Sequence, residues 1–149
     1  MRIAIGSDHG GFKLKKEILD FLSGKGHQII DFGTDTDTCS SDYPDYALLV
    51  CEAVTSGKSE KGIVICGTGL GISMAANKVR GIRAALCTDS YMARMSREHN
   101  DANILALGGR VIGPGLALDI VEIWLSTAFS GELRHANRVN KIMKMEQML

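Results

Sequence analysis

The chain has 149 residues, the size of one ordinary domain, and we expect a single domain over residues 1–149. With 45% hydrophobic and 23% charged residues, it has the composition of a folded protein, not of a disordered or fibrous one. Basic and acidic residues number 17 each, so no basic field predicts a nucleic-acid partner. No apolar run approaches the ~18 residues of a membrane helix, and Asp8 comes too early for a signal peptide. We expect no membrane association, and a cytoplasmic protein whose cysteines are reduced thiols without metal-type spacing: Cys39, Cys51, Cys66 and Cys87.

Five short apolar segments recur along the chain, each followed by a turn and a helical pattern. The expected strands are, in chain order, RIAIGS (2–7), HQIIDF (27–32), GIVIC (62–66), IRAALC (82–87) and NILALGG (103–109). The expected helices cover about 10–22, 45–54, 71–78, 89–99 and 114–129, and a last helix from about Arg134 to Leu149 has no strand after it. The strands are apolar throughout, as in a parallel sheet that is covered on both faces. The pattern predicts the α/β class: a Rossmann-like three-layer α/β/α fold with a five-stranded parallel sheet and an extra C-terminal helix.

Ligands of such sheets bind beyond the carboxyl ends of the strands. That position makes five stretches candidates for a site: 7–9, the loop into Tyr43, 66–71, 88–89 and 108–110.

The central loop CGTGLGISMAANK (66–78) carries glycines at 67, 69 and 71. It departs from the dinucleotide-binding pattern because Ile72 stands where a glycine or alanine is needed, although Asp89 lies at a suitable distance to bind a ribose. The Gly-Lys-Ser/Thr of a P-loop is absent as well. Glycines before a helix N-terminus favour an anion site, and a plain tight turn is the alternative.

Cys66 opens this loop, at the end of a buried strand and facing a helix N-terminus. Such surroundings favour the thiolate. A thiolate beside oxyanion-binding amides suits covalent attack on a carbonyl, or removal of a proton next to one. The alternative is that Cys66 is a small buried hydrophobe, which is how we interpret the other three cysteines.

Further polar residues could converge on the same site. Asp8 and His9 follow the first strand and could hold sugar hydroxyls or merely cap a turn. His99 could be a general acid–base or a helix C-terminal residue. Three arginines could surround a phosphate or simply be surface charges: Arg110, Arg134 and Arg138. The apolar residues of the last helix favour a partner subunit.

Four motifs together resemble the B-type ribose-5-phosphate isomerases, in the family that also holds the galactose-6-phosphate isomerase subunits. The motifs are SDHGGFKLK (7–15), SDYPDYA (41–47), CGTGLGISMAANK (66–78) and REHNDANILALGGR (97–110). The resemblance covers nearly the whole chain, and the spacing of the four motifs fits.

The resemblance implies a reversible isomerisation of ribose 5-phosphate and ribulose 5-phosphate in the pentose phosphate pathway, with no metal and no cofactor. Cys66 would move a proton between C2 and C1, and Thr68 with the amides of Gly67, Gly69 and Gly71 would hold the enediolate. His99 would open the furanose ring. Asp8, His9, Tyr43 and Asn100 would hold the sugar, and Arg110, Arg134 and Arg138 the phosphate. The family assembles as a homodimer or a dimer of dimers, in which His99 and Asn100 would reach the partner's Cys66.

Two other functions remain open from the sequence. One is isomerisation of a six-carbon sugar phosphate, such as allose 6-phosphate or galactose 6-phosphate. The other is a non-catalytic nucleotide-binding module, against which the incomplete glycine pattern counts.

Overall fold

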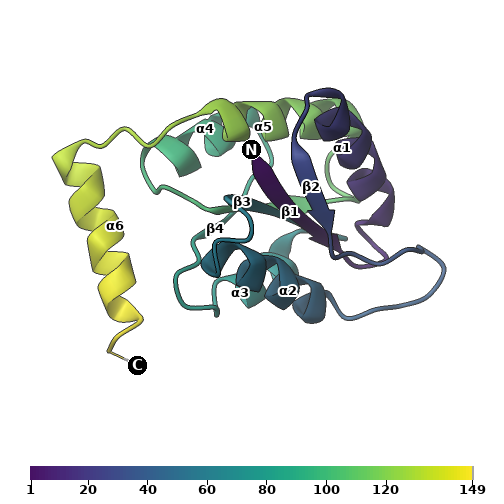
Figure 1. Ribbon diagram of the computed structural model, residues 1–149, viewed down its shortest axis with the longest axis horizontal. Helices are drawn as coiled ribbons and strands as arrows, with labels where there is room; N and C mark the ends of the chain where they lie inside the picture. Colours follow the sequence, from purple (N-terminus) through teal and green to yellow (C-terminus); the bar gives the residue numbers. More distant parts are fainter. Residues whose placement is uncertain (149) are drawn as a thin grey trace.

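A parallel sheet of five strands lies at the centre of the computed structural model, which describes residues 1–148 (Figure 1). The strands are β1 (Arg2–Ser7), β2 (Gln28–Asp31), β3 (Lys61–Cys66), β4 (Ala84–Leu86) and β5 (Ile104–Gly108), in the order β2-β1-β3-β5-β4. The helices are α1 (Phe12–Gly24), α2 (Tyr43–Thr55), α3 (Leu70–Ala76), α4 (Ser90–Glu98), α5 (Pro114–Ser126) and α6 (Leu133–Met145). The predicted fold class is confirmed.

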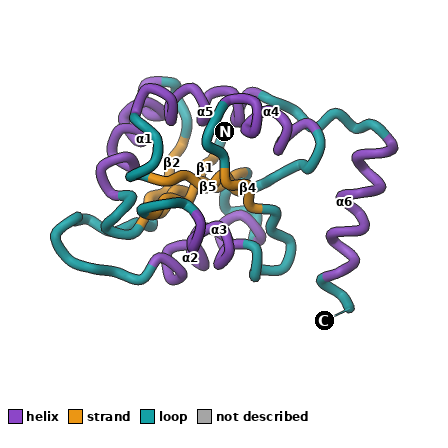
Figure 2. Tube along the Cα trace, turned by 180° about the vertical axis from the view of Figure 1, so that it is seen from behind, coloured by secondary structure: helices purple, strands orange, loops and turns teal. Residues whose placement is uncertain are grey.

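Helices cover both faces of the sheet, as its apolar strands require. Helices α1, α4 and α5 lie on one face, and α2 and α3 lie on the other (Figures 1 and 2). Neighbouring strand residues point to opposite faces. Ile3 and Ile5 therefore join the cluster under α1 and α5, while Ala4 joins the cluster under α2. Side chains on both faces of the strands are buried, each set in its own cluster, which explains why the strands are apolar throughout.

The carboxyl ends of the three central strands meet at one edge of the sheet. Ser7 of β1 pairs with Ile65 of β3, and Cys66 pairs with Gly108 of β5. This register brings three loops together: the loop after β1, the loop after β3 and the loop after β5. We call this side the carboxyl edge.

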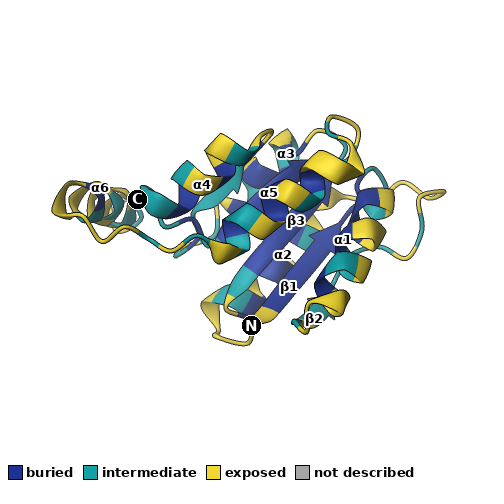
Figure 3. Ribbon diagram, turned by 90° about the horizontal axis from the view of Figure 1, so that it is seen from above, coloured by how far each residue is buried: buried dark blue, intermediate teal, exposed yellow. Residues whose placement is uncertain are grey.

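Helix α6 stands apart from the three layers, joined to α5 by the segment 127–132 (Figures 1 and 3). The expected helix reached Leu149, which lies outside the described residues. That prediction is wrong for residues 146–148, because Gln147 N and Met148 N donate to Lys144 O and Met145 O in short turns. The side chain of Glu146 accepts the Gly81 amide at 3.0 Å, so it fixes this end of α6 near β4.

Within residues 1–148, no helix combines the length and the apolar character that crossing a membrane requires.

Candidate active site

Cys66 lies at the end of β3, and the loop after it bends back over the sulfur. The Gly69 amide donates to Cys66 Sγ at 3.1 Å, and the side chain is buried, with 4% exposed. Gly69 has φ of 78°, and a Cβ there would lie 2.5 Å from Leu86 Cδ1 and 2.9 Å from the carbonyl carbon of Leu107. Only glycine permits this turn. The loop thus places the sulfur at the end of β3, against a backbone amide donor at the start of α3.

The other groups of the loop remain available to an oxyanion. Thr68 Oγ1 accepts the Leu70 amide at 3.3 Å, which leaves the hydroxyl hydrogen for a ligand. Gly71 lies in the first turn of α3, where an amide has no partner inside the helix. Tyr43, in the first turn of α2, lies beside Gly71, since a Cβ on Gly71 would meet Tyr43 Oη at 2.7 Å.

Asp8 and His9 follow β1 and lie beside this loop. Asp8 is buried, and its Oδ1 accepts the Gly11 amide at 3.0 Å. His9 and Ser41 exchange two hydrogen bonds: Ser41 N donates to His9 Nδ1 at 3.1 Å, and His9 N donates to Ser41 Oγ at 3.3 Å. Because Nδ1 accepts, a neutral His9 carries its proton on Nε2 and can donate from there to a ligand.

Arg110 brings a positive charge to the same edge. Its backbone amide donates to Gly67 O at 2.9 Å, and its guanidinium lies beside Gly67. A cavity of about 290 Å³ opens between the loop after β1 and the loop after β5; it is lined by His9, Gly10, Lys13, Asp37, Gly109 and Arg110. Lys13 Nζ lies 3.4 Å from Asp37 Oδ2, while the Arg110 guanidinium and the site's polar groups suit a small phosphorylated ligand.

Four predicted site residues lie elsewhere. His99 and Asn100 follow α4, and the five-residue strand β5 separates them from the carboxyl edge. The His99 ring packs against the ring of His135 in α6, with centroids 4.0 Å apart. Arg134 and Arg138 lie on this exposed helix, and Arg134 Nε pairs with Glu132 Oε2 at 2.8 Å. The structure therefore brings these residues to a second place, formed by the end of α4 and the start of α6.

Sequence reasoning missed two residues that hold the site in place. Ser41 fixes His9, and it stands in the motif that was interpreted only through Tyr43. Lys15 is 2% exposed, and its Nζ donates to Asp31 Oδ2 at 2.7 Å and to Thr34 O at 2.9 Å. It thus fixes the start of the loop that carries Ser41. A lysine on the inner face of an amphipathic helix was the available signal.

The remaining buried thiols have different surroundings from Cys66. Burial, and secondarily Glu52, raises the pKa of Cys51 to about 12. Burial raises the pKa of Cys87 to about 11, with a further rise from Asp89 and an opposing hydrogen bond from Ser96. Both are protonated at neutral pH, which agrees with reading them as core residues.

Within residues 1–148, no three histidine, cysteine, aspartate or glutamate side chains gather in a way that could hold a metal ion.

Comparison with known proteins places this geometry in a family. The family model described as Ribose/Galactose Isomerase matches residues 3–142. The chain is 50% identical to ribose-5-phosphate isomerase B of Escherichia coli, over 98% of this chain and 97% of that protein. It is 45% identical to D-erythrulose-4-phosphate isomerase of Pectobacterium atrosepticum, over 88% and 86%. The solved ribose-5-phosphate isomerase B of Clostridium thermocellum superposes with a TM-score of 0.97 at 66% identity, covering 99% of both chains.

The chain therefore belongs to the ribose/galactose isomerase family, and the resemblance inferred from the four motifs is confirmed.

Proposed function

We propose that this protein is an aldose–ketose isomerase that interconverts ribose 5-phosphate and ribulose 5-phosphate in the pentose phosphate pathway. The observation that carries the proposal is the hydrogen bond from the Gly69 amide to Cys66 Sγ, inside a loop with further free donors. Family membership and the names of the similar proteins support the substrate. The whole chain, 1–149, would act as one sugar-phosphate isomerase domain.

The Cys66 thiolate would remove the proton from C2 of the open-chain aldose and return it to C1, while the hydroxyl proton passes from O2 to O1, so that C1 becomes the hydroxymethyl carbon and C2 the carbonyl carbon of the ketose. The intermediate enediolate carries negative charge on oxygen. The Thr68 hydroxyl and the amides of Gly67 and Gly71 would bind that oxygen. The Gly69 amide faces the sulfur, so its first effect would be on the thiolate. Proton transfer with amide stabilisation needs neither a metal nor an organic cofactor.

Ring opening must precede this step, because ribose 5-phosphate is mostly a furanose. We assign the ring-opening proton to His99, and the holding of the sugar hydroxyls to Asp8, His9, Tyr43 and Asn100. Arg110, Arg134 and Arg138 would bind the phosphate with charge-assisted hydrogen bonds.

We further propose that each site combines two chains, in a homodimer or a dimer of dimers. In one chain, the sheet keeps His99 away from Cys66, and α6 stands out from the body (Figure 3). A groove of about 480 Å³ lies between α6 and the β4 side of the sheet. Apolar side chains of α6 are exposed, including Leu133 at 77% and Met145 at 60%. A second copy would cover these surfaces and receive His99, Arg134 and Arg138 at its Cys66.

The remaining expectations are consistent with this chemistry. The partner would be a small sugar phosphate, with no nucleic acid and no membrane. Within residues 1–148 all four cysteines are free thiols, which supports a cytoplasmic location.

The test is whether the purified protein equilibrates ribose 5-phosphate with ribulose 5-phosphate in metal-free buffer. In deuterated water, the recovered sugar phosphate should carry solvent hydrogen at C1 or C2. The same assay with allose 6-phosphate and galactose 6-phosphate ranks the six-carbon alternatives. Nucleotide binding without any turnover would replace the isomerase proposal with a binding module.

A further inference from the structure

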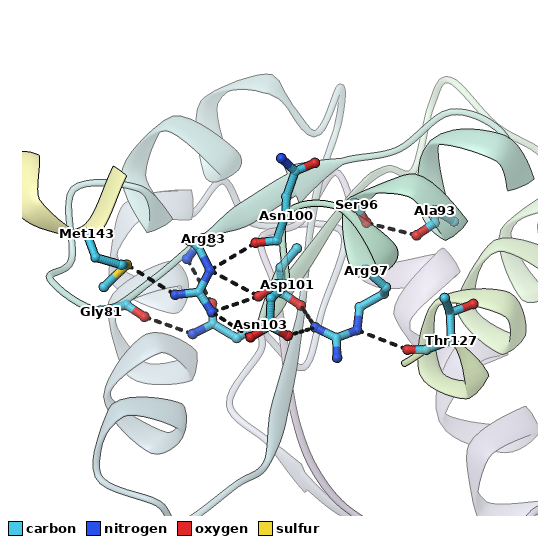
Figure 4. A network of polar contacts seen from close by, with 11 residues as sticks. Gly81, Arg83, Ala93, Ser96, Arg97, Asn100, Asp101, Asn103, Thr127 and Met143 are labelled. Atoms are coloured by element: carbon cyan, nitrogen blue, oxygen red, sulfur yellow. Dashed lines mark hydrogen bonds and ion pairs between the residues drawn. The ribbon is translucent and has the colours of Figure 1, made fainter. Parts of the chain in front are cut away.

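A network of charged side chains surrounds the turn between α4 and β5 (Figure 4). Asp101 lies at its centre. Arg97 Nη1 donates to Asp101 Oδ1 at 2.8 Å, and Arg83 Nη2 lies 3.3 Å from Asp101 Oδ2. Arg83 also donates to the Asp101 carbonyl oxygen, from Nη2 at 2.7 Å and from Nε at 3.0 Å. Two guanidinium groups thus bind one carboxylate and the backbone next to it.

The backbone at Asp101 is unusual. Among residues 1–148, it is the one non-glycine residue with a positive φ, at 45°. Aspartate tolerates this left-handed region better than most residues. The turn directs the chain from the end of α4 into β5, and Asp101 N still donates to Arg97 O at 3.1 Å. The conformation and the ion pairs therefore fix each other.

The side chains of the two residues before Asp101, His99 and Asn100, are not bound by the network. Only the carbonyl oxygen of Asn100 enters it, accepting Arg83 Nε at 3.1 Å. The Asn100 side-chain amide points away from the arginines in Figure 4, and in the described part of the chain it makes no hydrogen bond. His99 projects toward α6, where its ring meets His135. The backbone of this segment is held while both side chains stay available.

The same two arginines also contact α6 and the segment 127–132 that leads to it; together we call these two parts the arm. Arg83 Nη1 donates to Met143 Sδ at 3.2 Å, and Arg97 Nε donates to Thr127 O at 3.3 Å, where α5 gives way to the connecting segment. One carboxylate therefore aligns the arginines that contact both the His99 segment and the arm.

We propose that Asp101 is a positioning residue of the isomerase. Its carboxylate, held between Arg83 and Arg97, sets the orientation in which His99 and Asn100 meet the substrate. The inference rests on the proposed role of His99 in ring opening. Proton transfer demands hydrogen-bond reach within tenths of an ångström, so a small rotation of this segment lowers the rate without unfolding the protein.

The test is a double-mutant cycle of Asp101→Asn and His99→Asn, read in kcat for ribose 5-phosphate. Asparagine keeps the left-handed preference and the size but removes the charge. Alone, Asp101→Asn should lower kcat by about tenfold, as expected for a misplaced proton donor. The furanose also opens spontaneously in water, so His99→Asn keeps a residual rate. In that background, Asp101→Asn should lower kcat by less than about twofold, because no histidine is left to position.

A matched control is Glu122→Gln in α5, which removes a carboxylate that pairs with Lys25 and should leave kcat unchanged. If Asp101→Asn does not fold, Arg83→Lys serves instead, since it keeps the charge but loses the fork that binds Asp101. Equal losses in both backgrounds, or no loss in the wild type, would overturn the positioning role. A normal kcat in His99→Asn alone would instead overturn the proposed role of His99, and the inference with it.

Discussion

The two ends of the sheet carry different parts of the proposed site. At the carboxyl edge, Cys66, its glycine loop and His9 are joined to their neighbours by short hydrogen bonds. At the other end, His99 packs on an arm that stands away from the body. Five strand residues rising about 3.3 Å each separate the two ends by roughly 16 Å. The comparison teaches that one chain holds the proposed base and the proposed oxyanion donors together, and presents the other proposed site residues at the opposite end.

Removing the proposed base, Cys66, should have the largest effect on activity. Cys66→Ala should lower kcat by about 10²–10⁴-fold, the usual contribution of a positioned general base. Cys66→Ser should lose nearly as much, because a hydroxyl is far less acidic than a thiol. Cys51→Ala is the matched control: that thiol is also buried but lies in the core, so kcat should be nearly unchanged. A near-normal kcat in Cys66→Ala would show that Cys66 is not the base and that the reaction does not depend on it.

Hybrid dimers test whether the two ends belong to one site. Cys66→Ala and His99→Asn chains should each be nearly inactive as homodimers. In a hybrid, one site carries both lesions and the other carries none. After full subunit exchange, half of the dimers are hybrids with one intact site of two, so about a quarter of wild-type activity should return.

The control for this experiment uses chains that carry both substitutions. Mixed with either single mutant, they form no intact site and should restore nothing. If hybrids confirmed by mass stay as inactive as their parents, Cys66 and His99 serve the same chain, and the division between the two ends is wrong.

Phosphate binding by the arm should give a smaller and more selective effect. Loss of one charge-assisted contact in Arg138→Ala should cost about 1.5–3 kcal/mol, or roughly 10- to 150-fold in kcat/KM. Activity on unphosphorylated ribose should fall much less. Arg134→Ala should behave alike, although a phosphate must first displace Glu132. Lys141→Ala removes an exposed charge from the same helix and serves as the control. Equal losses on both sugars would indicate a structural role for Arg138.

The carboxyl edge was the more predictable end from the sequence. Strand ends, glycines and Cys66 are local features, and parallel pairing forces them together. The contact of His99 with His135 was not predictable from local pattern, because it depends on how α6 leaves the body, and residues 127–132 carry no strong periodicity. The Asp101 network was missed for a similar reason. Arg83 lies 18 residues away in sequence, so its contact with Asp101 is tertiary.

The smallest expected effect concerns stability at the end opposite the thiol. Lys61 starts β3, with its Nζ 5.1 Å from the Trp124 ring centroid. Burial, and then the charge of Arg97, lower the pKa of Lys61 from 10.5 to about 8. Between pH 8 and 10.5, the unfolded chain holds the proton more tightly than the folded one. The free energy of unfolding contributed by this residue therefore rises with pH in that window, and the folded state bears the cost of a buried charge below pH 8.

Lys61→Met should remove this dependence. The variant should exceed the wild type in free energy of unfolding at pH 7 by roughly 1 kcal/mol, a value reduced for solvent screening of the partly exposed ammonium. The difference should shrink between pH 8 and pH 10, as wild-type Lys61 loses its proton in the folded state. Denaturant unfolding at several pH values measures it, and the exposed Lys58→Met is the control. Parallel pH curves for wild type and variant would show that Lys61 is not desolvated in the folded state.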